Sequence, residues 1–170
     1  MKLVYEHENA QLWYDPNHKI LKAIWFGEVG FEAFANLLTR GAQVLNASDY
    51  GHIIFDRREL NNFSAEARIW FKQEFMKKGG DGRRLIKKVR KIAAVKGTGT
   101  IGQLASAVFG KILLIFNPKL KYRVFENNDV ADLWVKRINR EADLSMQIES
   151  KNTKRGLHRW LFNRNSQNQA

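Results

Sequence analysis

The segment from His52 to Met76 constrains the fold more than any other part of the chain. It opens with a β-branched and aromatic run that stops at Asp56. A polar stretch, residues 57–63, follows and predicts a loop. From Ser64 the spacing changes to that of a helix, with an apolar face made of Ala67, Trp70, Phe71 and Phe75. Such a strand-to-helix crossing is typical of α/β folds, where polar side chains and free backbone N–H groups gather.

Strand and helix patterns continue on both sides of this crossing. Strands are predicted over residues 4–6, 11–14, 19–29, 51–55, 89–96 and 122–126. Four helices are predicted. The first covers residues 31–45, the second begins at Ser64 and ends before the glycines at 79–82, and the third follows the glycine turn at 97–100 and ends at about residue 114. The fourth is capped by Asn127 or Asn128 and has an apolar stripe of Val130, Leu133, Trp134 and Ile138. The order predicts an α/β fold whose mixed sheet has antiparallel N-terminal strands, a parallel centre and about four helices.

Two details of the third strand, residues 19–29, add to this expectation. Both of its faces are mostly apolar, which places it inside the sheet rather than at an edge. Gly27 interrupts the pattern and predicts a bulge or a close backbone approach.

The chain has 170 residues, of which 44% are hydrophobic, enough for one core. After Ser145 it turns polar, so we expect one domain over residues 1–145 and a basic, flexible tail over residues 146–170. The absence of cysteine excludes disulfides, thiolate nucleophiles and cysteine metal sites. An acidic N-terminus without a secretion signal and an interrupted apolar run over Ile101–Phe116 predict a cytoplasmic protein.

Net charge departs most from the average. The 29 Lys and Arg against 17 Asp and Glu give +12, which favours an acidic protein partner or an anionic membrane surface. One basic run is opposed only by Asp81 and supplies candidate anion-binding residues: Lys77, Lys78, Arg83, Arg84, Lys87, Lys88, Arg90 and Lys91. If this run binds a ligand, phosphate is the expected group. A solvated loop explains it equally well, and the lack of aromatic residues argues against specific nucleic-acid binding.

The tail contains a second basic cluster. Leu157, Trp160 and Leu161 stand at helical spacing. Lys154, Arg155, Arg159 and Arg164 accompany them, which suits contact with an anionic membrane or a partner. A disordered extension, or one ordered in a homodimer, explains the same pattern.

Several segments resemble STAS-type proteins of the SpoIIAA-like fold from bacteria. The resemblance covers roughly residues 3 to 138 and rests on the strand order, Trp25-Phe26-Gly27, the Phe55-Asp56 strand end and Ala131-Asp132-Leu133-Trp134. It implies a small regulatory or ligand-binding domain, since relatives are switched by serine phosphorylation at this crossing and the fold also serves lipid-carrying domains. Asp56 matches the acidic strand end, and Ser64 is the nearest counterpart of the serine. The Asp-Ser-Ser-Gly-like cluster of the family is replaced here by Asn62-Phe63-Ser64-Ala65.

Ser64 allows a structural and a functional interpretation. Its hydroxyl can accept the backbone N–H of Ala67 and so begin the helix as an N-cap. A phosphate on Ser64 could instead meet Arg57, Arg58 and Arg68.

The glycine turn Gly97-Thr98-Gly99-Thr100-Ile101-Gly102 matches a dinucleotide fingerprint letter by letter. Only one further strand follows it, whereas a dinucleotide fold needs several, so no nucleotide cofactor is expected and a weak anion site remains open. His52 and Asp56 stand four residues apart on a strand, at ~13 Å, so they cannot form a triad with Ser64. The other histidines have no metal-ligand spacing.

Two hypotheses of different classes follow, both non-enzymatic. The first is a protein-interaction domain that acts through residues 56–64, with Asp56, Arg57, Arg58 and Ser64 as contacts or as a phospho-switch. The second is a small-molecule or lipid-head-group binding domain with its ligand near residues 97–102. A pocket of a few hundred Å³ lined by aromatic residues would favour the second hypothesis, and a filled core the first.

Overall fold

The computed structural model describes residues 1–97 and 113–137. The chain divides into two units, Met1–Val135 and Lys136–Ala170, and of the second unit only residues 136 and 137 are described. The predicted boundary at residue 145 and the tail therefore lie outside the described residues, as does most of the glycine turn. No helix within the described ranges is both long enough and apolar enough to cross a bilayer.

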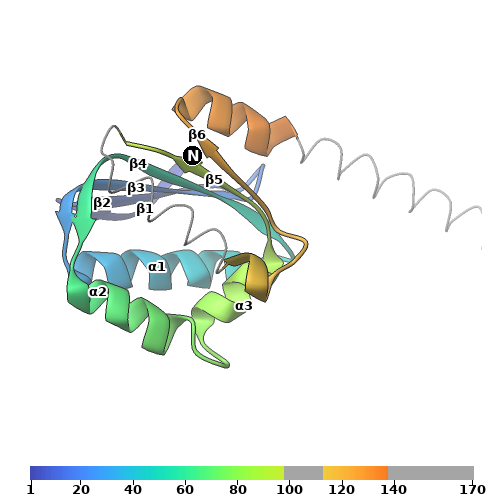
Figure 1. Ribbon diagram of the computed structural model, residues 1–170. Coiled ribbons are helices and arrows are strands. Elements are labelled where there is room, and N and C mark those ends of the chain that lie inside the picture. Colours follow the sequence, from blue (N-terminus) through green and yellow to red (C-terminus); the bar gives the residue numbers. More distant parts are fainter. Residues whose placement is uncertain (98–112, 138–170) are drawn as a thin grey trace, which may run out of the picture. The chain divides into compact units, whose positions relative to one another are not determined.

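A six-stranded sheet forms the frame of the first unit (Figure 1). Its strands lie side by side in chain order: β1 (Lys2–His7), β2 (Ala10–Asp15), β3 (Ile20–Val29), β4 (Gly51–Phe63), β5 (Val89–Val95) and β6 (Lys121–Phe125). The first three strands pair antiparallel, and β3 to β6 pair parallel. The predicted mixed sheet, antiparallel at its start and parallel at its centre, is confirmed.

Strand β3 lies inside the sheet, between β2 and β4, as its two apolar faces predicted. Its register with β4 shifts next to Gly27, whose φ of 56° is in the left-handed region that favours glycine. The predicted irregularity at Gly27 is therefore confirmed, and it bends the strand where it passes Asn9.

Helices cover the two faces of the sheet unequally (Figure 1). On one face lie α1 (Phe31–Asn46), α2 (Ala65–Trp70), the π-helix η1 (Phe71–Phe75) and α3 (Asp81–Lys88). This face holds the larger core, in which α1 buries one side against β2 and β3. The opposite face holds a smaller cluster: Ile20, Ile54, Ala93, Val95 and Phe125 of the sheet with Ala131 and Val135 of a helix over residues 128–137.

The helix over residues 128–137 begins as predicted but buries only part of the expected stripe. The side chain of Asn127 accepts the backbone N–H of Asp129 at 2.7 Å, which confirms the predicted cap. Val130 and Leu133 of the expected apolar stripe are 52% and 68% exposed. Trp134 is partly buried against the smaller cluster, and Ile138 lies outside the described residues. The helix instead turns the small Ala131 to the sheet, because a short side chain lets the two backbones approach closely.

Two further expectations are wrong in detail. Residues 57–63 form the second half of β4 rather than a loop. The reason is that the end of β3, from Phe26 to Val29, pairs with this half of β4 as far as Phe63. Residues 81–88 form the helix α3 rather than a surface loop, because Leu85 and Ile86 enter the larger core. In both segments tertiary contacts override a polar local composition.

Candidate ligand cavity

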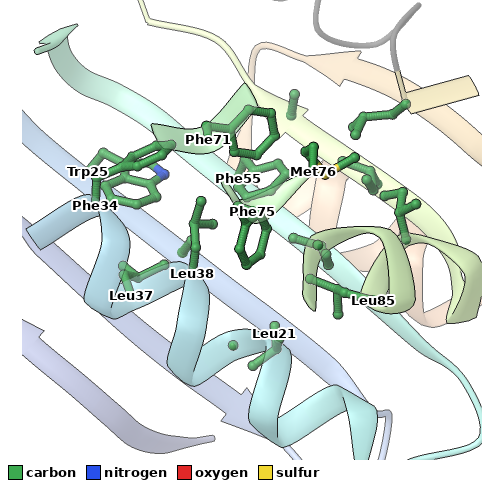
Figure 2. A pocket seen from close by; sticks show the side chains of 18 of the residues that line it. Leu21, Trp25, Phe34, Leu37, Leu38, Phe55, Phe71, Phe75, Met76 and Leu85 are labelled. Carbon is green, nitrogen blue, oxygen red and sulfur yellow. The ribbon is translucent and has the colours of Figure 1, made fainter. Parts of the chain in front are cut away.

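A cavity of about 240 Å³ lies between the sheet and the helices of its larger core (Figure 2). One wall comes from the sheet and includes Leu21 and Trp25 of β3 and Phe55 of β4. The other wall comes from the helices, with Leu38 of α1 and Phe75 of η1. The remaining described lining residues are Leu12, Ala23, Phe34, Leu37, Gly41, Ile53, Arg57, Phe63, Arg68, Phe71, Met76, Gly82, Leu85, Ile86, Ile92, Ala94, Leu113 and Tyr122.

Aromatic rings stiffen the wall of this cavity. Phe63 packs edge-on against Trp25 and Phe34, with ring centroids 5.2 and 4.8 Å apart. Phe71 and Phe75 pack against each other at 5.7 Å. Large rings fixed by their neighbours hold the wall open, while small residues such as Ala23 and Ala94 leave space between them.

Few polar side chains reach this apolar lining. Strand alternation sends Ile53, Phe55 and Arg57 to the helix-covered face, and all three line the cavity. Arg57 is half-buried, and Arg68 is exposed, which places Arg68 at the opening. Burial lowers the pKa of the Arg57 guanidinium, and the nearby Tyr122 offsets part of that effect. Burial also raises the pKa of the Tyr122 phenol, so this hydroxyl stays protonated at neutral pH.

Arg58 lies on the other side of β4 and has a different partner. Its guanidinium donates to both oxygens of Asp56, at 2.9 and 2.8 Å, and its backbone N–H donates to the same carboxylate at 3.3 Å. Asp56 is only 2% exposed. The carboxylate that the sequence offered as a contact site is therefore buried, next to the point where the register between β3 and β4 shifts.

Ser64 caps α2. Its hydroxyl accepts the backbone N–H of Ala67 at 3.1 Å, which confirms the structural interpretation of this residue. The three arginines near Ser64 in sequence have other surroundings. Arg58 binds Asp56, whereas Arg57 and Arg68 line the cavity.

The residues of the basic run are spread over different surroundings. Lys77 and Arg84 form ion pairs with Glu74 and Asp81 on their own helical turns. Lys78 and Lys87 are exposed. The remaining four contact the fold: Arg83 lies over the Phe116 ring, Arg90 over the Tyr50 ring, Lys88 donates to Asn46 and Ser48, and Lys91 is buried against Trp134.

The start of the glycine turn lies beside the cavity wall. A Cβ atom on Gly97 would stand 2.8 Å from the carbonyl oxygen of Arg57, so only glycine fits there without a shift. Residues 98–102, and the tail residues Arg155, Arg159, Trp160 and Leu161, are outside the described ranges. Among the residues described, no three His, Asp or Glu side chains come together as a metal site would need.

The sequence did not reveal the cavity itself. The available signal was the set of small residues, Ala23, Gly41, Gly82 and Ala94, on otherwise apolar elements. That these residues face one space depends on the packing of five strands against the helices, which no local pattern records.

The similarity of this chain to known proteins is one of fold. No family model matches the chain, and no curated protein matches it. Among solved structures, it is similar to an uncharacterised protein of the DUF3478 family from Shewanella loihica PV-4, with 16% sequence identity over 77% of this chain and 98% of that chain and a TM-score of 0.49. That neighbour is described as having a SpoIIAA-like fold, the fold that the strand order and short motifs of this sequence resemble.

Proposed function

We propose that this domain is a non-enzymatic binding protein that takes up a small, largely apolar molecule in the cavity between the sheet and α1, α2, η1 and α3. The observation that carries the proposal is the cavity of about 240 Å³ with its aliphatic and aromatic lining. An apolar cavity of about 150 Å³ is already large enough to bind benzene.

The lining of the cavity favours an apolar occupant. A molecule that fills the space of about 240 Å³ would contact the aliphatic and aromatic side chains of the wall and remove their surface from water. A ligand that binds the folded state in this way stabilises the fold.

The cavity favours this role over protein contact through residues 56–64. Asp56 is buried and paired, and Ser64 is engaged as a helix cap. A regulatory role of the kind that the resemblance implies is compatible with ligand binding. Because Phe63 at the end of β4 lines the cavity, an occupant would stiffen the strand whose outer residues, such as Asn61 and Asn62, are exposed.

A neutral probe tests the proposal. Octanol at tenfold excess over its Kd should stabilise the protein by about 1.4 kcal/mol, which corresponds to a rise in Tm of about 3–6 °C. Ala94→Leu, which adds three carbon atoms inside the cavity, should weaken this response, because Ala94 is a lining residue that is 1% exposed.

The matched control is Ala65→Leu, the same substitution at an exposed position on α2. It should keep the response of the parent protein. Absence of a saturable octanol response in the parent, or an unchanged response in Ala94→Leu, would contradict the proposal.

A further inference from the structure

The cavity has a charge as well as a shape. Among its described lining residues, Arg57 and Arg68 are charged, both are cations, and no Asp or Glu is present. Arg57 is the inner of the two, since it is half-buried whereas Arg68 is exposed. An apolar cavity with a guanidinium on its wall is complementary to a molecule that has an apolar body and one anionic end.

Tyr122, which lies near Arg57, helps to define which anionic group the cavity would bind. Tyr122 lies on β6 near Arg57 and lines the same cavity. The protonated phenol can donate one hydrogen bond, and the planar guanidinium can donate two in parallel. A carboxylate accepts such a set with its two oxygens, and its single charge matches the one cation that is half-buried.

The size of the cavity sets the length of the apolar part. At ~30 Å³ for each water-sized group, 240 Å³ holds roughly eight chain atoms. The walls next to that space are aliphatic and aromatic, with Leu38, Phe75 and Met76 among them (Figure 2).

We infer that the ligand is a medium-chain amphiphile with a single carboxylate, bound with its head group at Arg57 and Tyr122 and its tail in the apolar cavity. This inference rests on the proposed binding function and adds the chemical class of the ligand. It also separates two adjacent arginines, because Arg58 on the outer side of β4 is held by Asp56 and takes no part.

The test compares three probes that share a chain and differ in the head group: octanoate, octanol and octylammonium. For the parent protein at neutral pH, calorimetry should give the order octanoate, octanol, octylammonium from tightest to weakest. The carboxylate should be favoured over the alcohol roughly tenfold, as one charge-assisted contact implies. Equal affinity for octanoate and octanol, or tighter binding of octylammonium, would overturn the inference without any variant.

Variants locate the head group. Arg57→Gln should lower the affinity for octanoate roughly tenfold and leave that for octanol within about twofold. Arg57→Lys should keep part of the preference for octanoate that Arg57→Gln loses, because lysine has the positive charge but cannot donate two parallel hydrogen bonds. Arg40→Gln, at an exposed position on α1, is the matched control and should bind all three probes as the parent does.

The outcomes distinguish the inference from the function on which it rests. If the parent binds octanol and Arg57→Gln keeps the full preference for octanoate, the cavity function stands and the carboxylate assignment is wrong. If the parent binds none of the three probes, the proposed function itself fails.

Discussion

Neighbouring residues on an extended strand face opposite ways, and on β4 this gives Arg57 and Arg58 different roles. Arg57 reaches the cavity, and Arg58 binds the buried carboxylate of Asp56. The sequence placed both in one contact site, because in a loop they would share a surface. A hydrogen bond between near neighbours, such as that of Ser64 with Ala67, depends on local spacing and could therefore be predicted.

Ser64→Ala should lower the free energy of unfolding by ~1 kcal/mol, the usual effect of losing an N-cap. The reason is that the backbone N–H of Ala67, a residue with 0% exposure, loses its acceptor. Urea denaturation measures the change, and Ser64→Asp, which keeps an acceptor oxygen, serves as the control. Equal stability of Ser64→Ala and the parent protein would contradict this account of the helix start.

Asp15 should contribute to the dependence of stability on pH. Burial would raise the pKa of Asp15, but hydrogen bonds and charge from His18 and the backbone N–H of Asn17 outweigh this and lower it. A carboxyl group with a depressed folded-state pKa stabilises above its unfolded value, ~3.9, and that contribution is lost as the pH falls through the folded value. Asp15→Asn should therefore lose less stability than the parent below about pH 4. Parallel pH profiles from urea unfolding would contradict the expectation.

At the level of elements, some residues of the basic run hold parts of the fold together. The ammonium group of Lys88, at the end of α3, donates to the carbonyl oxygens of Asn46 and Ser48 at 2.6 and 3.0 Å. Asn46 is the last residue of α1, and Ser48 lies two residues beyond it, so one side chain joins α3 to the end of α1 and satisfies a carbonyl that a helix end leaves open.

Lys88→Met keeps most of the aliphatic stem but removes these two bonds, and it should destabilise the protein by about 1–2 kcal/mol. Lys87→Met, one residue away and exposed, should stay within ~0.5 kcal/mol of the parent. Chemical denaturation of the pair measures the difference. If both variants behave alike, Lys88 does not link the two helices.

The elements that the sequence predicted well are those with a long, one-sided apolar pattern. Helix α1 is one, with Phe34, Leu38, Ala42 and Leu45 buried along one face. The elements that it missed are short or polar. Helix α3 has eight residues and starts among glycines, and the far half of β4 carries charged and amide side chains. Their conformation is set by partners distant in sequence, β3 for the strand and the larger core for the helix.

For the whole molecule, the mixed sheet with its antiparallel start and parallel centre followed from general rules of chain connection, whereas the cavity did not. Each of the parallel strands after β3 lies beside the one before it, as short connections favour. The cavity is the space left where aromatic rings meet small residues from several elements. Its position and its one half-buried guanidinium are properties of packing, so they could be reached only through the assembled structure.

The basic tail is expected to bind anionic membranes through its charged and its apolar residues, without contributing to the stability of the fold. Every buried hydrophobic residue of the described chain lies at or before Val135. Removing residues 151–170 should therefore leave the Tm and the octanol response unchanged. Binding to vesicles that contain anionic lipid should be lost, since each basic residue near such a surface contributes roughly 1 kcal/mol and Trp160 adds apolar burial.

Fluorescence of the full chain provides the second measurement. On addition of anionic vesicles the emission of Trp160 should shift to the blue, because an indole that enters the membrane interface leaves water. Trp160→Phe should bind the same vesicles without that component of the shift, and neutral vesicles should cause none. If the shortened chain unfolds at a lower temperature instead, the tail is part of the fold or of a homodimer contact, and its charge serves that contact rather than a membrane.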